Sequence, residues 1–591
     1  MSTTGRGAGG RLALFAPPLV LVTVVLLFYG RALDRPFTSE DFLLLRFLGE
    51  NPPWRDLLGQ LTSPWLEISV VRFYRPVSTL LYGAEIAVFG ANPIGYNAVH
   101  ILLHLVNALL VWAISRRLSG EDLTAFAAAF LFAIHPLHPN AVVFSASFAT
   151  LFGAFFLLAA MLTYQRFRET GSLVTWGASL SLFVFALGSY EAAAVLPGLL
   201  AAYDHLVGIR AAPGRRHASL PRGYLPFFGV LGLYLLFRRS LFGESIGGYQ
   251  EYRERLLAPE IRRLAHDLAT SIHQLHLPVY DRPPELWVLT VSCAVLVGLP
   301  LAVWLLLRRS LDRPWLFAWA WILASLAPFA FRPSVPGNGR YWYLAAAGVA
   351  MSVCFAVRGR LAPVAAGLLA FSWGILLAGS IDATVAAGRT ARTIQAELVR
   401  AGRASASTIF LTRYPYFLEN EAQVPIAQVY HYGVWDSVHP PFVQARVPVF
   451  PLPPLAGAEL LPVALGAPGS PIYEWEGDAG TIRPFPFDPR MAEGLAEFQV
   501  LRFRDGAAEV AVPPGSHARF RLIVSSRING AVFDLPPGAV RNGVLRADLP
   551  DEFLATSDSL YGRGEHFWWI EAKDADGRVS GFSRMRRFRL R

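Results

Sequence analysis

The sequence predicts a mostly α-helical membrane protein: a polytopic bundle of about eleven transmembrane helices, followed by a β-rich extracytoplasmic region that ends in a β-sandwich. Only 16% of the 591 residues are charged and the mean hydropathy is positive, whereas soluble domains carry about a quarter charged residues. Apolar stretches of about 18 residues or more, long enough to cross a hydrocarbon core of roughly 30 Å, recur up to residue 380. Beyond it, apolar runs shorten to strand length between prolines and glycines.

Each predicted span corresponds to its own apolar run. The expected spans lie at 12–30, 93–114, 122–135, 141–164, 173–189, 190–206, 222–240, 286–307, 315–331, 341–357 and 361–380. Arginine clusters fall in every second connection, at 116–117, 166–168, 210–222, 308–313 and 358–360. Because basic residues in short loops mark the cytoplasmic side, we expect a cytoplasmic N-terminus and extracytoplasmic C-terminal domains, in a bacterial-type inner membrane.

The net charge of +10 does not indicate nucleic-acid binding, because the arginines lie in connecting loops and the tail, where topology and anionic headgroups explain them. Membrane lipids are the expected partners of these residues. The two cysteines, Cys293 and Cys354, both fall within predicted spans, which gives no support for a disulfide framework or a zinc site. We expect the first apolar stretch to be a retained anchor, since no small-x-small cleavage site follows it.

Three of the predicted outer loops are long or unusual. The loop at 31–92 contains amphipathic pieces at 41–48 and 77–89, which predict helices rather than a linker. The loop at 241–285 contains a basic, helix-like stretch at 253–276 with leucines and an isoleucine on one side, a pattern typical of interfacial helices. The loop at 332–340 is a short turn rich in proline and glycine.

The tail divides into two predicted modules. Residues 381–490 are expected to form a mixed α/β module, with strands at 408–411 and 447–450. Residues 491–591 are expected to form strands at 518–525, 531–535, 566–572 and 584–590. Their aromatic strand, Asp576-Gly577 turn and Ser-Gly-aromatic-Ser exit resemble the closing hairpin of a fibronectin type III domain.

Two adjacent carboxylates, Glu40 and Asp41, follow the first span. A carboxylate where an acceptor hydroxyl and an activated donor can meet could act as a general base. The alternative is structural: Thr38 or Ser39 caps a helix whose first turn holds both carboxylates, which the helix dipole favours.

The second span carries a polar stripe of Asn97, His100, His104 and Asn107 at three- and four-residue spacing, which places all four on one face. Such residues line a cavity or form hydrogen bonds between helices. We favour the second alternative for His104 and Asn107, and leave His100 open.

Further polar residues lie at predicted outer boundaries. His135 and His138 flank an outward turn, where they could touch a phosphate or merely shape the turn; a metal is less favoured because a third ligand is missing. Glu191 lies in an apolar stretch, and such a carboxylate needs a partner or a function. Arg340, among aromatic residues, suits a lipid phosphate or interfacial snorkelling; Arg75 is similar.

These motifs occur in a characteristic order. The run comprises Phe73-Tyr74-Arg75-Pro76-Val77, Asn92-Pro93-Ile94-Gly95-Tyr96-Asn97, His104, His135-Pro136-Leu137-His138, Tyr190-Glu191 and Gly339-Arg340-Tyr341-Trp342-Tyr343. Over residues 12–380 the chain resembles the GT-C glycosyltransferase superfamily, in particular bacterial members similar to the protein O-mannosyltransferases and to the transmembrane, tetratricopeptide-bearing O-mannosyltransferases. Three features depart from that pattern: Tyr190 replaces a lysine, residues 145–148 replace an Arg-x-Asp/Glu motif, and the tail is β-rich rather than tetratricopeptide.

The resemblance implies a membrane glycosyltransferase that moves a sugar from a polyprenyl-phosphate donor to a glycan, lipid or protein acceptor on the outer face. It implies Asp41 as the catalytic base with Glu40 supporting it. The expected phosphate-binding residues are Arg340, His135, His138 and Arg75, and the supporting polar residues are His100, His104, Glu191 and Tyr343. Beyond the lipid-linked donor, a divalent cation remains an alternative cofactor. The alternative functions are a non-catalytic envelope scaffold and a glycan or lipid transporter, although no paired repeats favour transport.

Overall fold

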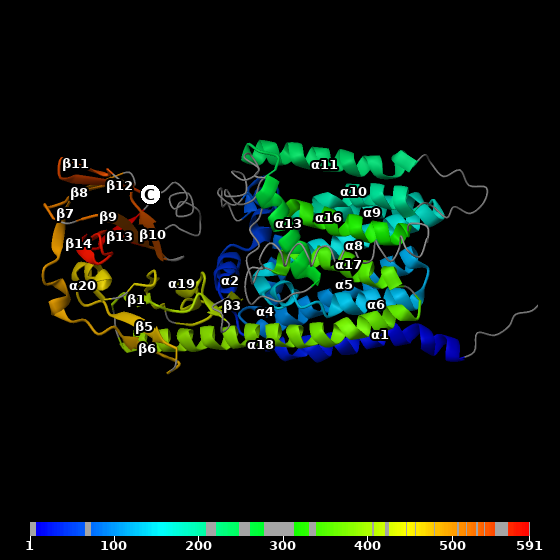
Figure 1. Ribbon diagram of the computed structural model, residues 1–591, viewed down its shortest axis with the longest axis horizontal. Helices are drawn as coiled ribbons and strands as arrows, with labels where there is room; N and C mark the ends of the chain where they lie inside the picture. The colour runs from blue at the N-terminus through cyan, green and yellow to red at the C-terminus, as the bar shows by residue number, and fades with distance from the viewer. Residues whose placement is uncertain are drawn as a thin grey trace, which may run out of the picture.

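The structure is a computed structural model. It describes residues 8–65, 72–207, 220–246, 261–276, 312–329, 339–357, 359–404, 407–419, 425–444, 446–455, 457–477, 479–504, 507–515, 517–526, 530–536, 538–549 and 565–589. A bundle of helices forms one end of the molecule and a β-rich region forms the other, with the long helix α18 running along the bundle and out to the strands (Figure 1).

The helical bundle follows the apolar runs of the sequence. Its main helices are α1 (Ala8–Tyr29), α5 (Pro93–Ser119), α6 (Asp122–Ala133), α8 (Phe148–Thr170), α9 (Leu173–Leu187), α10 (Leu196–Ala202), α11 (Leu220–Phe242), α16 (Arg313–Leu326), α17 (Tyr343–Val357) and α18 (Leu361–Ala404). Within the described residues, five helical segments are long and apolar enough to cross a membrane, at 93–119, 145–170, 221–242, 339–357 and 361–403. The count of eleven spans stays a prediction, and the span expected at 286–307 lies outside the described residues.

Two predicted spans differ from the observed helices. The span expected at 141–164 begins only at Phe148, because the short helix α7 (Pro139–Val142) and a 3-10 turn at Ser145–Ser147 come first. The span expected at 190–206 is broken into a 3-10 turn, the short α10 and a π-turn at Tyr203–Val207. Hydrophobic periodicity alone does not distinguish such broken segments from one continuous helix.

The predicted cytoplasmic connections gather at one end of the bundle. Arg117, at the end of α5, lies 3.1 Å from Glu169 at the end of α8. The Gly359 amide, between α17 and α18, donates to the Glu121 carboxylate at 2.8 Å. The loops after α5, α8 and α17 therefore lie together, as the arginine clusters predict, and the side of the membrane that they face stays a prediction.

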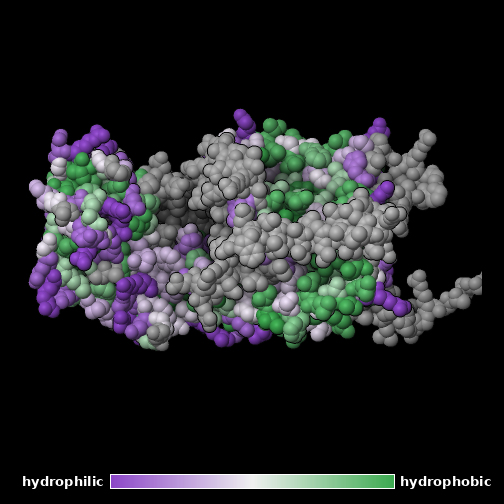
Figure 2. Space-filling view, in the orientation of Figure 1, coloured by the Kyte–Doolittle hydropathy of each residue, from purple (hydrophilic) through white to green (hydrophobic). Residues whose placement is uncertain are grey.

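The surface of the bundle suits lipid. Figure 2 shows apolar residues over the helices and mostly polar residues over the strands. Large apolar side chains are exposed on α11 and α18, among them Leu233 at 68%, Leu368 at 75% and Phe371 at 76%. Water would oppose this exposure, whereas hydrocarbon tails would not.

The first outer loop and the loop at 241–285 contain the predicted helices. In the first loop these are α2 (Glu40–Glu50), α3 (Leu57–Thr62) and α4 (Pro76–Phe89). In the loop at 241–285, α13 (Ile261–His276) covers the described part of the expected interfacial helix. Both amphipathic segments of the first loop are thus confirmed as helices.

At about 1.5 Å per residue, the 44 residues of α18 span about 66 Å, roughly twice a hydrocarbon core. Its second half therefore extends beyond the bundle to a small sheet of order β4-β1-β5-β6. The strands are β1 (Ile409–Thr412), β4 (Val449–Pro451), β5 (Ile472–Glu476) and β6 (Thr481–Pro484), where β1 pairs in parallel with β4 and β5. The short hairpin β2 (Phe417–Glu419) and β3 (Pro425–Gln428) and the helices α19 (Val434–Ser437) and α20 (Leu461–Gly466) complete this mixed α/β module.

The last region is a nine-stranded array of order β10-β9-β13-β14-β7-β8-β12-β11, with β15 on β13. Its strands are β7 (Ala496–Arg504), β8 (Ala507–Ala511), β9 (Arg519–Ser525), β10 (Gly530–Asp534), β11 (Val540–Arg541), β12 (Val544–Asp548), β13 (Glu565–Lys573), β14 (Val579–Ser583) and β15 (Arg586–Arg589). The predicted strands and the hairpin turn at Gly577, with φ +80°, are confirmed. The closure into a fibronectin-like sandwich stays a prediction.

Strand β13 joins the two outer regions through its alternating faces. Trp568 and Ile570 point into the core of the β-rich region, whereas Phe567 and Trp569 pack with Phe410 of the module. Successive residues of a strand face opposite sides, so one aromatic strand serves two cores. The outer regions are therefore attached by buried apolar contacts and not by a flexible linker.

We expect Trp569→Ala to separate these regions. Trp569 is fully buried, and truncating such a side chain costs about 3–5 kcal/mol through lost burial and the cavity left behind. Limited proteolysis of the purified protein should then cut the C-terminal region earlier than in the wild type. Val532→Ala, at a site 37% exposed on β10, should leave the cleavage rate unchanged.

Candidate active site

The candidate site begins at the first turn of α2, which contains Glu40 and Asp41. The helix dipole stabilises negative charge at this end of the helix. The predicted hydroxyl cap is wrong, because neither Thr38 nor Ser39 caps the helix with its side chain. Instead, the Asp41 carboxylate accepts the Thr38 amide at 3.0 Å, and the Ser39 hydroxyl accepts the amide of Tyr432 at 3.1 Å. Ser39 has a φ of +45°, an uncommon conformation for a residue other than glycine. The start of α2 is therefore held by a contact with the outer module, at Tyr432, and not by a hydroxyl cap.

Asp41 is fully buried and its carboxylate is saturated by donors. One oxygen accepts the Ala146 amide at 2.8 Å. The other accepts the Thr38 amide and a guanidinium N–H of Arg35, the latter at 3.2 Å. Burial raises the pKa of Asp41, and the neighbouring Arg35 opposes that shift. This carboxylate is closed off from an acceptor hydroxyl in the observed conformation.

Glu40, by contrast, remains 25% exposed and faces Arg340. The Arg340 guanidinium lies 3.5 Å from the Glu40 carboxylate, 3.4 Å from the Ser147 hydroxyl and 3.4 Å from the Tyr341 hydroxyl. Charge-assisted hydrogen bonds are usually 2.7–2.9 Å long, so these contacts are loose. An acid and a cation from distant parts of the chain thus meet at a partly accessible position.

The outer module adds a histidine to this pair. His431 follows β3 in the chain and lies close enough to Glu40 and Arg340 for both charges to act on it. Burial and the Arg340 charge lower the pKa of His431, and Glu40 acts against them. A lowered pKa favours the neutral imidazole, which can donate one hydrogen bond and accept another.

Glu191, which was expected to need a partner or a function, forms an ion pair with Arg75. The Arg75 guanidinium binds the Glu191 carboxylate at 3.0 and 2.9 Å, and the Tyr74 amide adds a third contact at 3.1 Å. The guanidinium also lies 3.9 Å from the Phe73 ring centre. Glu191 therefore has its partner in Arg75.

The polar stripe of α5 forms hydrogen bonds between elements. The two nitrogens of His104 lie 2.7 Å from the Tyr343 hydroxyl and 3.0 Å from the Ala133 carbonyl. Asn107 donates to the Tyr343 hydroxyl at 3.2 Å. This confirms the structural interpretation of these two residues and accounts for Tyr343. His100, the open case, lies 3.2 Å from the buried carboxylate of Glu85, which the sequence analysis did not identify.

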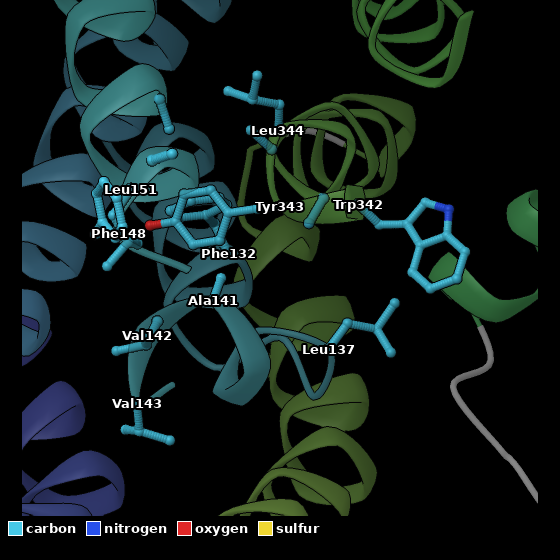
Figure 3. Close-up of a cluster of buried hydrophobic side chains, with 14 of the residues drawn as sticks. Phe132, Leu137, Ala141, Val142, Val143, Phe148, Leu151, Trp342, Tyr343 and Leu344 are labelled. Carbon is cyan, nitrogen blue, oxygen red and sulfur yellow. The ribbon is translucent and has the colours of Figure 1, made fainter. Parts of the chain in front are cut away.

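The two histidines of the outward turn are buried. His135 donates to the Leu275 carbonyl at 2.9 Å, and the His138 ring packs 4.5 Å from that of Tyr343. Figure 3 shows the apolar cluster on which this turn rests, with Leu137 beside Trp342 and Phe132 beside Tyr343. Gly339 fits against the turn because a Cβ there would lie 2.2 Å from the Leu137 oxygen. The turn thus packs against Gly339, the residue before Arg340. Its two histidines are buried and are not exposed to a phosphate.

The described residues offer no cluster of three or more His, Cys, Asp or Glu side chains that could hold a metal ion. The site as described is an acid–cation pair with a neighbouring imidazole. Sequence patterns missed Arg35, Glu85, Ser147 and His431, because no local spacing pairs Arg35 with Asp41 or Glu85 with His100, and Ser147 and His431 meet Arg340 only in the folded chain.

No family model matches the chain. The chain is similar over 188 residues, at 29% identity, to "Protein O-mannosyl-transferase TMTC1" of Homo sapiens, over 29% of this chain and 21% of the relative. It is also similar to "Protein O-mannosyl-transferase TMTC2" of Mus musculus, at 35% identity over 174 residues, which is 27% of this chain and 20% of the relative. The chain therefore spans about a fifth of the length of these relatives, and the predicted resemblance is confirmed over that part.

Among solved structures, the chain is similar to the archaeal oligosaccharyltransferase AglB from Archaeoglobus fulgidus, in complex with an inhibitory peptide and a dolichol-phosphate, with a TM-score of 0.38 and 13% identity over 62% of this chain and 56% of that chain. It is also similar to ArnT from Cupriavidus metallidurans, bound to undecaprenyl phosphate, with a TM-score of 0.36 and 15% identity over 67% of this chain and 72% of that chain.

We expect Asp41→Asn and Glu40→Gln to differ in stability. Removing the charge of Asp41 leaves Arg35, which is 1% exposed, buried without its counter-ion, a change that costs about 3–5 kcal/mol. Thermal unfolding of the detergent-solubilised protein should show a clear fall in Tm for Asp41→Asn. Glu40→Gln breaks only a loose contact and should melt within about a degree of the wild type. Equal Tm values for both variants would contradict the structural role of the Arg35–Asp41 pair.

Proposed function

We propose that this protein is an integral-membrane glycosyltransferase that moves a sugar from a polyprenyl-phosphate donor to an acceptor hydroxyl at the extracytoplasmic face. The observation that carries this proposal is the pairing of Glu40 with Arg340. It lies at the end of the bundle opposite the arginine-rich connections, beside the exit of α18. Similarity to proteins named O-mannosyl-transferases over somewhat more than a quarter of the chain, 29% and 27%, supports the same reaction class.

The proposed step is an inverting displacement. The acceptor oxygen attacks the anomeric carbon while its proton passes to the Glu40 carboxylate. The bond between that carbon and the phosphate oxygen breaks, and the electron pair leaves with the polyprenyl phosphate. Arg340 then stabilises the charge that develops on the leaving phosphate, which is where a preorganised cation contributes most.

These roles revise the assignments expected from the resemblance. Glu40 replaces Asp41 as the base, because it is the partly accessible member of the pair. Asp41 becomes a positioning residue, since its three donors hold the first turn of α2. Arg340 alone keeps the expected phosphate contact, because Arg75 is held by Glu191 and the turn histidines are buried. A lipid-linked sugar is the donor, and no step needs a metal ion.

Glu40→Gln should abolish most transfer. Loss of a general base slows reactions by about 10²–10⁴-fold, so consumption of a radiolabelled polyprenyl-phosphate sugar in the presence of acceptor should fall by at least about 100-fold. A panel of such donors should be offered to the purified protein, and Arg340→Ala should be equally inactive. Glu50→Gln, at the far end of the same helix and also exposed, is the matched control and should keep full activity. Full activity of Glu40→Gln would overturn the assignment, and consumption of no donor by the wild type would favour a scaffold instead.

Cysteine labelling tests the topology. In a background without Cys293 and Cys354, Thr62→Cys at the end of α3 should react with an impermeant maleimide added to whole cells. Arg116→Cys, 46% exposed at the opposite end of the bundle, should react only after permeabilisation. Labelling of both positions from the same side would contradict the placement of the site on the extracytoplasmic face.

A further inference from the structure

Four partly exposed aromatic rings of the outer module lie next to the candidate site. The His431 ring lies 4.1 Å from that of Tyr432, 5.4 Å from that of Phe417 and 6.2 Å from that of Tyr416. All four side chains are only partly buried. These four residues meet around the His431 ring, and we call them the aromatic platform: Tyr416, Phe417, His431 and Tyr432.

The aromatic platform is fixed to the residue that precedes the proposed base. The Tyr432 amide donates to the Ser39 hydroxyl at 3.1 Å, and the Ser39 amide donates to the Val429 carbonyl at 2.9 Å. Gly433, with φ +81°, allows this approach, because a Cβ there would lie 2.4 Å from the Ser39 carbonyl oxygen. The platform therefore has a defined position relative to Glu40.

A second layer of contacts makes the attachment rigid. Arg46 of α2 binds the Asp436 carboxylate at 3.0 Å and lies 4.4 Å from the Trp435 ring centre. Phe42 stacks on Tyr430 with ring centres 5.5 Å apart. The segment that carries the platform is thus bound to two positions of α2, Phe42 and Arg46. A ligand on the platform would therefore lie beside Glu40.

The chemistry of this surface fits a sugar ring. The C–H face of a pyranose packs on aromatic rings, which present a negative face to the positively polarised hydrogens. A neutral imidazole and phenol hydroxyls can exchange hydrogen bonds with sugar hydroxyls. A second phosphate fits less well, because Arg340 is the cation that the described contacts bring to this position, and the proposed leaving phosphate already uses it.

We propose that the aromatic platform is the acceptor subsite and that it binds a carbohydrate, so that the enzyme extends a glycan. This inference rests on the proposed function, since Glu40 would take the proton of a hydroxyl on the sugar that the platform holds. The tail then contributes directly to the site and selects the acceptor by its sugar. An unglycosylated serine or threonine side chain would not fill the platform.

Binding can be tested without catalysis. Saturation-transfer NMR on the full-length protein in nanodiscs, with maltose, cellobiose and mannobiose as probes, should show transfer to at least one disaccharide. Phe417→Ala and Tyr432→Ala should each reduce that signal at least fivefold. Phe487→Ala, which removes an aromatic ring 39% exposed elsewhere in the tail, should leave it unchanged. No signal in the wild type, or an undiminished signal in both platform variants, would overturn the inference.

Activity separates the two proposals. With the donor that the wild type consumes, Phe417→Ala should raise the KM for an oligosaccharide acceptor at least tenfold, whereas Phe487→Ala should leave both that KM and the hydrolysis of the donor without acceptor unchanged. Phe417→Tyr, which keeps the ring, should restore the wild-type KM. Transfer to a serine-containing peptide in preference to every oligosaccharide would overturn the glycan subsite but leave the transferase intact. Failure to consume any donor would instead contradict the transferase itself.

Discussion

The buried ion pair between Arg35 and Asp41 is the constraint on which the outer end of the molecule depends. Both side chains are removed from water, at 1% and 0% exposure, and such a pair is tolerable only when each partner neutralises the other and further donors satisfy the carboxylate. The amides of Thr38 and Ala146 do so, and they belong to the segments that precede α2 and α8. The pair therefore joins the exit of α1, the start of α2 and the entry of α8, and Glu40 is directed away from it toward Arg340.

The rigid helix α18 provides the second constraint. A helix of 44 residues holds the outer module at a fixed distance and direction from the bundle. The module is also bound to α2 by the ion pair between Arg46 and Asp436. The closed path of bundle, helix, module and loop leaves little freedom between the tail and the candidate site. A tail attached by a flexible linker could supply a binding domain, but it could not hold His431 beside Glu40.

Local patterns predicted the elements of this chain better than its contacts. Period-3.6 apolar runs indicated α2 and α4, and the alternating aromatic strand with its Asp-Gly turn indicated β13 and β14, because those signals lie within about ten residues. The roles of Asp41 and Arg75 could not be predicted in this way. Their partners, Ala146 and Glu191, lie 105 and 116 residues away, and only the folded chain shows that one carboxylate is buried while its neighbour is accessible.

The arginines at the outer end differ in the partners that their described contacts give them. Arg75 binds Glu191 through two contacts of 2.9–3.0 Å, and Arg35 is sealed with Asp41 in the interior. Arg340 has described polar contacts of 3.4–3.5 Å to Glu40, Ser147 and Tyr341, and its carboxylate partner Glu40 is the proposed base. A cation paired with the base lies where it could contact the leaving phosphate while the base takes the proton of the acceptor, so one ion pair would supply both groups that the proposed displacement needs.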